Sequence, residues 1–137
     1  MDKKTDLVDK AVSPEGAVKN SHFFDNAPPL LSKTFTWPEL HSGNDQMNAG
    51  SSLTIYSNGT AFFNCQTLCY STHSGDTWHH TLFVYSNNGQ LLFSGGQFNS
   101  PRMSDGNPPP VYSWSASFTF NAALFAAADH ATATYSA

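Results

Sequence analysis

From Lys33 onward, apolar and polar residues alternate in short runs, as they do in strands that bury one face. The clearest run extends from Tyr112 to Phe120, where serine or threonine fills every second position. Because the side chains of a strand point alternately to its two faces, the remaining positions share one face. This run predicts a half-buried strand whose inner face carries Tyr112, Trp114, Phe118 and Phe120.

A hairpin is predicted for residues 52–71. Its turn is Asn58-Gly59, a pair that tolerates the positive φ angle of a two-residue hairpin turn. Its second strand, residues 60–71, is polar on both sides. Asn64 and Gln66 share one side, which faces either a ligand or solvent.

A second hairpin is predicted for residues 78–98, with Asn87-Asn88-Gly89 as its turn. Gly95-Gly96 in its second strand indicates a bulge or a sharp bend. In its first strand, alternation turns His79 outward and places four side chains on the inner face, namely Trp78, His80, Leu82 and Val84.

Shorter elements complete the domain. We predict a strand at residues 34–37, a short helix at residues 122–128 with Asn121 as its N-cap, and a last strand at residues 130–136. Residues 39–50 are predicted to form a loop. This loop contains His41-Ser42-Gly43-Asn44-Asp45, a weak echo of His73-Ser74-Gly75-Asp76.

Residues 1–32 differ from the rest of the chain in composition and in residue pattern. They mix charged residues with prolines and show no sustained periodicity, which is typical of a segment that cannot offset its ordering entropy. We therefore predict a flexible N-terminal tail at residues 1–32 and a single β-barrel domain at residues 33–137.

The fold class follows from these elements. About seven strands are predicted, and short turns link most of them, as in an antiparallel meander. Strands so rich in aromatic residues would leave adhesive edges in an open sheet. We therefore predict an all-β fold that closes into a small antiparallel β-barrel, with a two-sheet β-sandwich as the alternative.

Composition limits the partners. The 137 residues carry a net charge of -4, and four of the six cations lie within the first twenty residues. Only Lys33 and Arg102 remain to contact a phosphate backbone, so we predict no nucleic-acid partner. No apolar run approaches the roughly 18 residues of a membrane span, and no secretory signal is visible. We expect a cytoplasmic protein without membrane association, and secretion of a trimmed form stays open.

Metals and cofactors are not predicted. Cys65 and Cys69 lie about 13 Å apart in one extended strand, too far for a disulfide, and are interpreted as small buried apolar side chains. Because adjacent residues of a strand point to opposite faces, at most two of His73, His79 and His80 could share a zinc ion. Calcium motifs, phosphate loops and dinucleotide fingerprints are absent from the sequence.

Two stretches concentrate the polar chemistry. Residues 73–80 and 99–112 hold the only arginine, three of the six histidines and two of the five acids that follow residue 32. We expect the two stretches to face each other. They also contain recognisable motifs, GDTWH at residues 75–79 and SPRMSDGNPPP at residues 100–110, the latter followed by Tyr112 and Trp114.

Together with the ending from Leu124 to Tyr135, these motifs make residues 33–137 similar to a family of small bacterial β-barrel proteins of unknown function. The resemblance implies a fold and supplies no activity.

The candidate site is drawn from these stretches. His80 would act as a general acid or base, since an aromatic interior disfavours its charged form. Asp76 would orient His80, and Arg102 or Tyr70 would stabilise developing negative charge. The predicted ligand-binding residues are Tyr70, Trp78, His79, Asp105, Tyr112 and Trp114. The alternatives are an interior histidine that only forms hydrogen bonds and an Arg102–aspartate pair that only pins the loop.

Two functions compete. The first is binding of a hydrophobic small molecule inside the barrel, within which a cofactor-independent cyclase or isomerase reaction is one hypothesis. The second is a non-enzymatic protein-interaction or effector module with a packed interior. A ligand barrel requires a cavity of roughly 300 Å³ or more that reaches His80, whereas an interaction module is packed solid.

Overall fold

The computed structural model describes residues 3–7, 10–13, 29–70 and 75–137. Strands dominate these residues, and the helix among them is one short 3-10 helix, so the all-β prediction is confirmed. The elements in chain order are β1 (Lys3–Leu7), β2 (Lys10–Ser13), β3 (Ser32–Thr36), β4 (Leu40–Ser42), β5 (Asp45–Met47), β6 (Ser52–Tyr56), β7 (Thr60–Cys69), β8 (His79–Ser86), β9 (Leu91–Asn99), β10 (Tyr112–Thr119), η2 (Ala122–Ala127) and β11 (Ala128–Ser136). The described residues contain no helix with the length and apolar character needed to cross a membrane.

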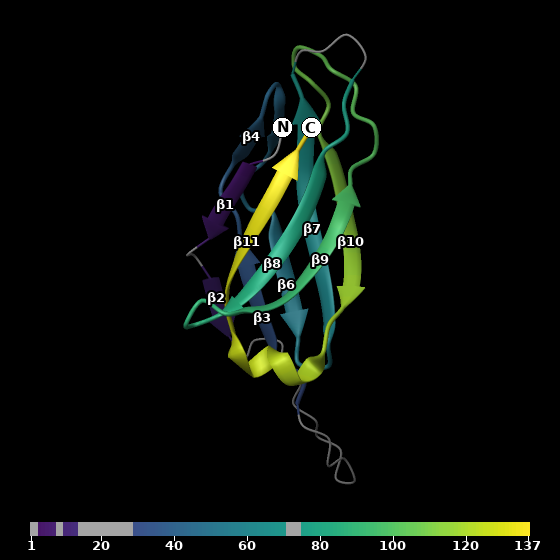
Figure 1. Cartoon of the computed structure of the whole chain (residues 1–137). Coiled ribbons are helices and arrows are strands. Elements are labelled where there is room, and N and C mark those ends of the chain that lie inside the picture. Colours follow the sequence, from purple (N-terminus) through teal and green to yellow (C-terminus); the bar gives the residue numbers. More distant parts are fainter. Residues whose placement is uncertain (1–2, 8–9, 14–28, 71–74) are drawn as a thin grey trace.

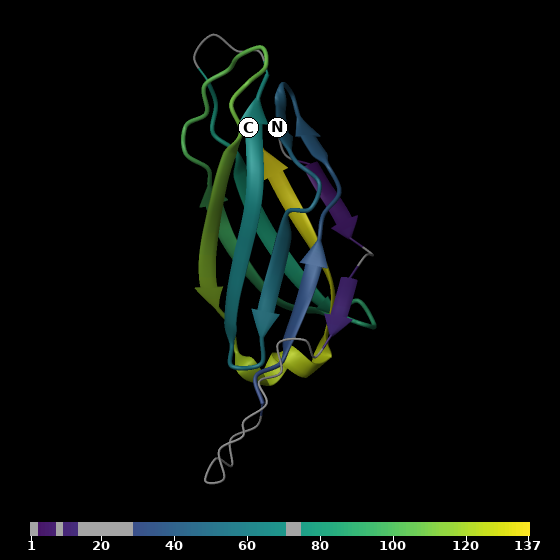
Figure 2. The same ribbon diagram turned by 180° about the vertical axis from the view of Figure 1, so that it is seen from behind.

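The strands form two sheets. Sheet A has the order β1-β11-β8-β9, and sheet B has the order β2-β3-β6-β7-β5-β4, with β10 added on β7. All strand pairings among the described residues are antiparallel, as expected. Sheet A is strongly curled and lies against sheet B (Figures 1 and 2). The result is a small all-β fold that combines features of a barrel and of a sandwich.

The order of the strands differs from a simple meander. After β9 the chain crosses to the other sheet, where β10 pairs with β7 over eight residues of each strand. Between β9 and β10, aromatic side chains make the contact: the ring of Phe118 lies 5.6 Å from that of Phe98 and 6.4 Å from that of Phe93. A Cβ at Gly95 would lie 2.6 Å from the tip of the Phe118 ring, so a larger residue at this position would displace the ring.

The predicted tail is wrong for its first part. β1 pairs with β11 of sheet A, and β2 pairs with β3 of sheet B, so the N-terminal segment joins the two sheets. Added strands are held by backbone hydrogen bonds, which require no alternation of apolar residues, and the sequence pattern therefore missed them. Residues 1–2, 8–9 and 14–28 of the predicted tail lie outside the described residues.

Both predicted hairpins are confirmed. Gly59 in the β6–β7 turn has φ +90°, and Gly89 in the β8–β9 turn has φ +86°. The β8–β9 register shifts opposite Gly95, at the predicted bulge. Asn121 caps η2, and its side chain accepts a hydrogen bond from the Ala123 N–H at 3.0 Å.

The prediction of a loop at residues 39–50 is wrong in its central part. β4 and β5 form a small hairpin there, with Gly43 at φ +62° in its turn. β5 also pairs with the end of β7, so that Asp45 lies opposite Cys69. Asp45 and Cys69 are more than twenty residues apart in sequence, so the local sequence pattern could not predict this pairing.

The core is aromatic. Its largest fully buried side chains include Phe35, Trp37, Phe63 and Trp78. All four side chains predicted for the inner face of β8 and its approach are fully buried. Cys65 and Cys69 are both buried and are not joined by a disulfide, as expected.

Candidate functional site

The two polar stretches face each other, as the sequence predicted. The Asp76 N–H donates to the Met103 carbonyl at 3.0 Å, and the Met103 N–H donates to the Asp76 carbonyl at 2.7 Å. The Ser100 N–H donates to the Trp78 carbonyl at 2.9 Å, and the Trp78 N–H donates to Ser100 Oγ at 2.8 Å. Four hydrogen bonds thus join the segment before β8 to the segment after β9. His73 lies outside the described residues.

Arg102 belongs to this junction. Its Nη2 donates to the Gly75 carbonyl at 3.4 Å. Gly75 has φ +77°, and a Cβ there would lie 2.3 Å from the Met103 carbonyl oxygen, so only glycine fits. These contacts support the alternative in which Arg102 pins the long loop, here through a carbonyl of the facing segment.

His80 lies inside the core, pointing inward as predicted. Its ring is 0% exposed, stacks on Phe63 at 4.5 Å and 17°, and meets Trp37 edge to face at 5.9 Å. Trp78 Nε1 donates to His80 Nδ1 at 3.1 Å. The acceptor role of Nδ1 places the proton of the neutral ring on Nε2, which has no partner among the described residues.

This environment determines the charge of His80. Desolvation by burial lowers its pKa to about 3. The ring is therefore neutral at physiological pH and a weak base. A general base must also lie within hydrogen-bond reach of the proton that it removes, and no face of this ring reaches solvent. The geometry matches the alternative of an interior histidine that forms a hydrogen bond.

The other predicted ligand-binding residues lie in different environments. Trp114 Nε1 donates to the buried Thr67 Oγ1 at 2.9 Å. His79 Nδ1 lies 2.5 Å from Asn99 Oδ1. Tyr112 Oη accepts a hydrogen bond from the Ser104 N–H at 3.0 Å, which lowers the pKa of Tyr112. Tyr70 is 48% exposed, and Asp105 is also exposed.

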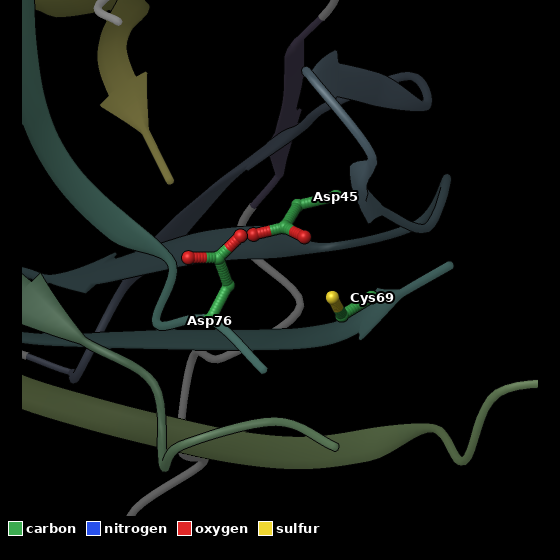
Figure 3. A group of neighbouring side chains, drawn as sticks. All are labelled: Asp45, Cys69 and Asp76. Carbon is green, nitrogen blue, oxygen red and sulfur yellow. The ribbon is translucent and has the colours of Figure 1, made fainter. Parts of the chain in front are cut away.

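One cluster at this end of the molecule was missed by the sequence analysis. Asp45 on β5, Cys69 on β7 and Asp76 before β8 each offer a ligand atom, and these atoms lie within 4.8 Å of one another. Figure 3 shows the two carboxylates pointing toward each other. The sequence contained one indication of this cluster: each of the two similar His-Ser-Gly stretches ends in an aspartate of the cluster, Asp45 in the first and Asp76 in the second.

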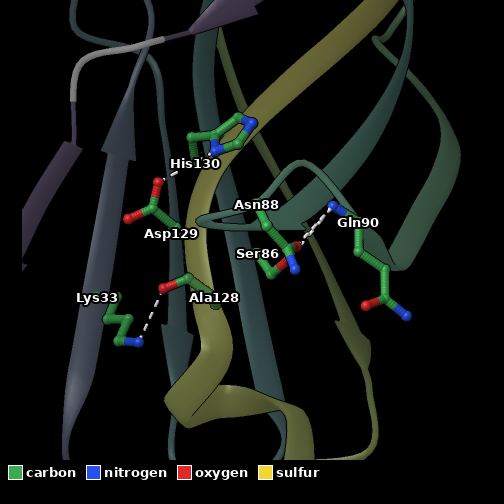
Figure 4. Close-up of polar contacts among 7 residues, drawn as sticks. All are labelled: Lys33, Ser86, Asn88, Gln90, Ala128, Asp129 and His130. Atoms are coloured by element: carbon green, nitrogen blue, oxygen red, sulfur yellow. Dashed lines mark hydrogen bonds and ion pairs between the residues drawn. The ribbon is translucent and has the colours of Figure 1, made fainter.

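Two grooves open on the surface of the described part. The first, of about 500 Å³, lies over β7, β10 and residues 49–51. The second, of about 800 Å³, lies between the β8–β9 turn and the segment from Ala126 to Asp129 (Figure 4). His80 lines neither groove.

Polar groups in the second groove are largely engaged. Lys33 Nζ donates to the carbonyls of Ala128 at 2.8 Å and Ala126 at 3.1 Å. Asp129 Oδ2 lies 3.1 Å from the ring of His130, and Ser86 Oγ bonds to Asn88 Oδ1. These contacts, of which Figure 4 draws all but the one to Ala126, hold η2 and the β8–β9 turn in place.

Fold and site together define a small all-β protein whose interior is packed with aromatic side chains and whose two grooves lie on its surface. The profile of a family of unknown function (DUF6294) matches residues 52–136. The chain belongs to this family, which confirms the prediction of a family without an assigned function. No curated protein and no solved structure matches the chain.

Proposed function

We propose that this protein is a non-catalytic binding module that holds an uncharged, hydroxyl-rich ligand, an oligosaccharide, on the first groove. The observation that carries the proposal is a patch of exposed polar side chains on β7 and β10 whose hydrogen-bonding groups are not used within the described structure. We call the side chains of Asn64, Ser113 and Ser115 the polar patch.

The polar patch is regular because it follows the pairing of the strands. Asn64 of the central strand lies between Ser52 of β6 and Ser115 of β10. Gln66, two residues along β7, lies opposite Ser113. Paired strands are about 4.8 Å apart, and residues two apart on one strand are separated by about 6.6 Å. Hydroxyl and amide groups thus repeat at spacings comparable to those of hydroxyls along a sugar chain.

The chemistry of the groove suits a neutral ligand. None of the described residues that line it carries a charge. Serine hydroxyls and asparagine amides both donate and accept hydrogen bonds, so they match sugar hydroxyls, which do the same. In the part of the chain that the structure describes, the three side chains of the polar patch make no hydrogen bond and are exposed. A ligand would therefore meet polar groups that require no rearrangement.

The packing around His80 favours this proposal over a ligand inside the fold. Phe63, Trp37 and Trp78 surround the ring. A hydrophobic small molecule beside His80, and a cyclase or isomerase reaction there, would require space that these rings fill. A packed interior was expected for the second of the two predicted functions, a non-enzymatic protein-interaction or effector module; the proposal keeps the absence of catalysis and replaces the protein partner by an oligosaccharide.

The test is calorimetric titration of the full chain with a panel of neutral oligosaccharides. Ser115→Arg fills the groove and should weaken binding at least about tenfold, a loss of about 1.4 kcal/mol. The matched control Ser94→Arg introduces the same side chain at an exposed serine of sheet A and should leave affinity within about twofold. Absence of binding, or equal binding by both variants, would reject the polar patch. Binding of an apolar dye with reduced affinity in a His80 variant would instead support the interior ligand.

A further inference from the structure

The cluster of Asp45, Cys69 and Asp76 lies in a different part of the fold from the polar patch. Asp45 stands opposite Cys69 in the pairing of β5 with β7, so these two side chains are adjacent through the strand register itself. Asp76 is held by the two backbone hydrogen bonds that it exchanges with Met103. Three backbone segments thus bring a thiol and two carboxylates to one point (Figure 3).

Asp45 requires a partner that the described residues do not provide. The residue is 1% exposed, and neither of its carboxylate oxygens has a hydrogen-bond partner among them. A buried carboxylate aimed at a second carboxylate is unfavourable unless a proton or a cation lies between them.

The set of donors selects the cation. A thiolate sulfur excludes the hard ions calcium and magnesium, which take oxygen ligands, whereas zinc accepts both sulfur and carboxylate oxygen. Atoms within 4.8 Å of one another lie at most about 2.8 Å from a common centre. Zinc ligands lie at about 2.0 to 2.3 Å, so small side-chain rotations suffice to close the site.

We propose that Asp45, Cys69 and Asp76 bind a zinc ion, with a fourth coordination position left to water. Such an ion joins sheet B, through β5 and β7, to the segment that leads into β8 of sheet A. Asp76 is half-buried, so it places one side of the site nearer to solvent. Three protein ligands and an open position are the arrangement in which zinc can also hold an exchangeable ligand.

The test uses cobalt(II) as a spectroscopic probe for zinc on the full chain freed of metal by a chelator. A thiolate-to-cobalt charge-transfer band should rise to one equivalent and disappear when zinc is added. Because the chain has only two cysteines, Cys69→Ser should abolish the band and the matched control Cys65→Ser should retain it. Asp45→Asn should weaken zinc binding at least about tenfold, since a lost ligand costs no less than a lost supporting contact.

Three results would overturn the site: no charge-transfer band in the wild-type chain, a band lost in Cys65→Ser and kept in Cys69→Ser, or undiminished zinc affinity in Asp45→Asn. The first would leave Asp45 and Asp76 as a proton-sharing pair. Circular dichroism shows whether Cys69→Ser folds. If it does not, a band in both the wild-type chain and Cys65→Ser still identifies Cys69 as the ligand, because Cys69 is then the only remaining cysteine. Oligosaccharide binding by the polar patch is measured separately, so the two proposals fail independently.

Discussion

Lowering the pH from 7 to 5 should destabilise the fold through His80. The ring is enclosed by aromatic side chains, and desolvation lowers its pKa to about 3 in the folded state. In the unfolded chain a histidine has a pKa of about 6.5. As the pH falls through 6.5, His80 becomes protonated in the unfolded state but stays neutral in the folded state. Stability contributed by the neutral ring is therefore present above pH 6.5 and is lost progressively toward pH 3.

The magnitude follows from proton linkage. One unit of pKa difference corresponds to about 1.36 kcal/mol, and between pH 7 and pH 5 the unfolded ring goes from mostly neutral to almost fully protonated. Integration over this interval gives a loss of about 2 kcal/mol in the free energy of unfolding. The raised pKa of Asp45 acts in the opposite direction, because the folded state then holds its proton more tightly than the unfolded state does.

A comparison with His80→Asn isolates the contribution of His80. Asparagine does not titrate, and its Oδ1 can accept the hydrogen bond from Trp78 Nε1 that His80 Nδ1 accepts. Urea unfolding at pH 7 should show a loss of about 1 to 3 kcal/mol in the variant, from the lost stacking on Phe63. At pH 5 the gap between wild type and variant should shrink by about 2 kcal/mol.

The matched control is His79→Asn, at the adjacent and partly exposed histidine, which should cost less than about 1 kcal/mol at pH 7. An NMR titration gives a direct second readout, because the His80 ring signals should stay constant from pH 7 to pH 5. The reasoning fails if those signals titrate in this interval, or if the gap between wild type and His80→Asn is the same at both values.

Two further predictions concern stability alone. Gly59→Ala and Gly89→Ala place alanine at similar positive φ angles, which lowers the free energy of unfolding by about 1 to 2 kcal/mol in each variant. Only at Gly59 does the new Cβ also lie close to another atom, 2.6 Å from the carbonyl oxygen of Phe120. Chemical denaturation should show a larger loss for Gly59→Ala by about 1 kcal/mol or more, and equal losses would contradict the contact. Lys33→Met removes the hydrogen bonds to three carbonyls at the end of η2. Thermal unfolding should show a loss of about 1.5 to 3 kcal/mol in the free energy of unfolding. A loss below about 0.5 kcal/mol would show that these hydrogen bonds add little to stability.

The parts of the fold that the sequence predicted are those with local causes. The turns at Gly59 and Gly89, the bulge at Gly95 and the N-cap at Asn121 each depend on residues within a few positions. The alternation that turned His80 inward is local as well. Pairings between distant segments were not predictable in this way: β10 with β7, β1 with β11 and β5 with β7 all join strands far apart in sequence.

The same distinction explains the outcome for the candidate site. The facing of residues 75–80 and 99–103 was predicted because unusual residue types concentrate in both stretches. Asp45 was missed, because only the pairing of β5 with Cys69 brings it to Asp76. The roles assigned to His80, Asp76 and Arg102 in catalysis stay predictions, and the geometry found for His80 and Arg102 matches their structural alternatives.

β7 connects the structural and functional arguments. Its inward side chains, among them Phe63, build the core around His80, whereas Asn64 on its outer face belongs to the polar patch and Cys69 at its end belongs to the proposed zinc site. Because the two faces of a strand alternate by residue, these tasks occupy different positions of one element. Changes at Asn64, on the outer face, should therefore act on oligosaccharide binding, and changes at Phe63, on the inner face, should act on stability. Cys69 is itself buried, so a change there is expected to affect both zinc binding and stability.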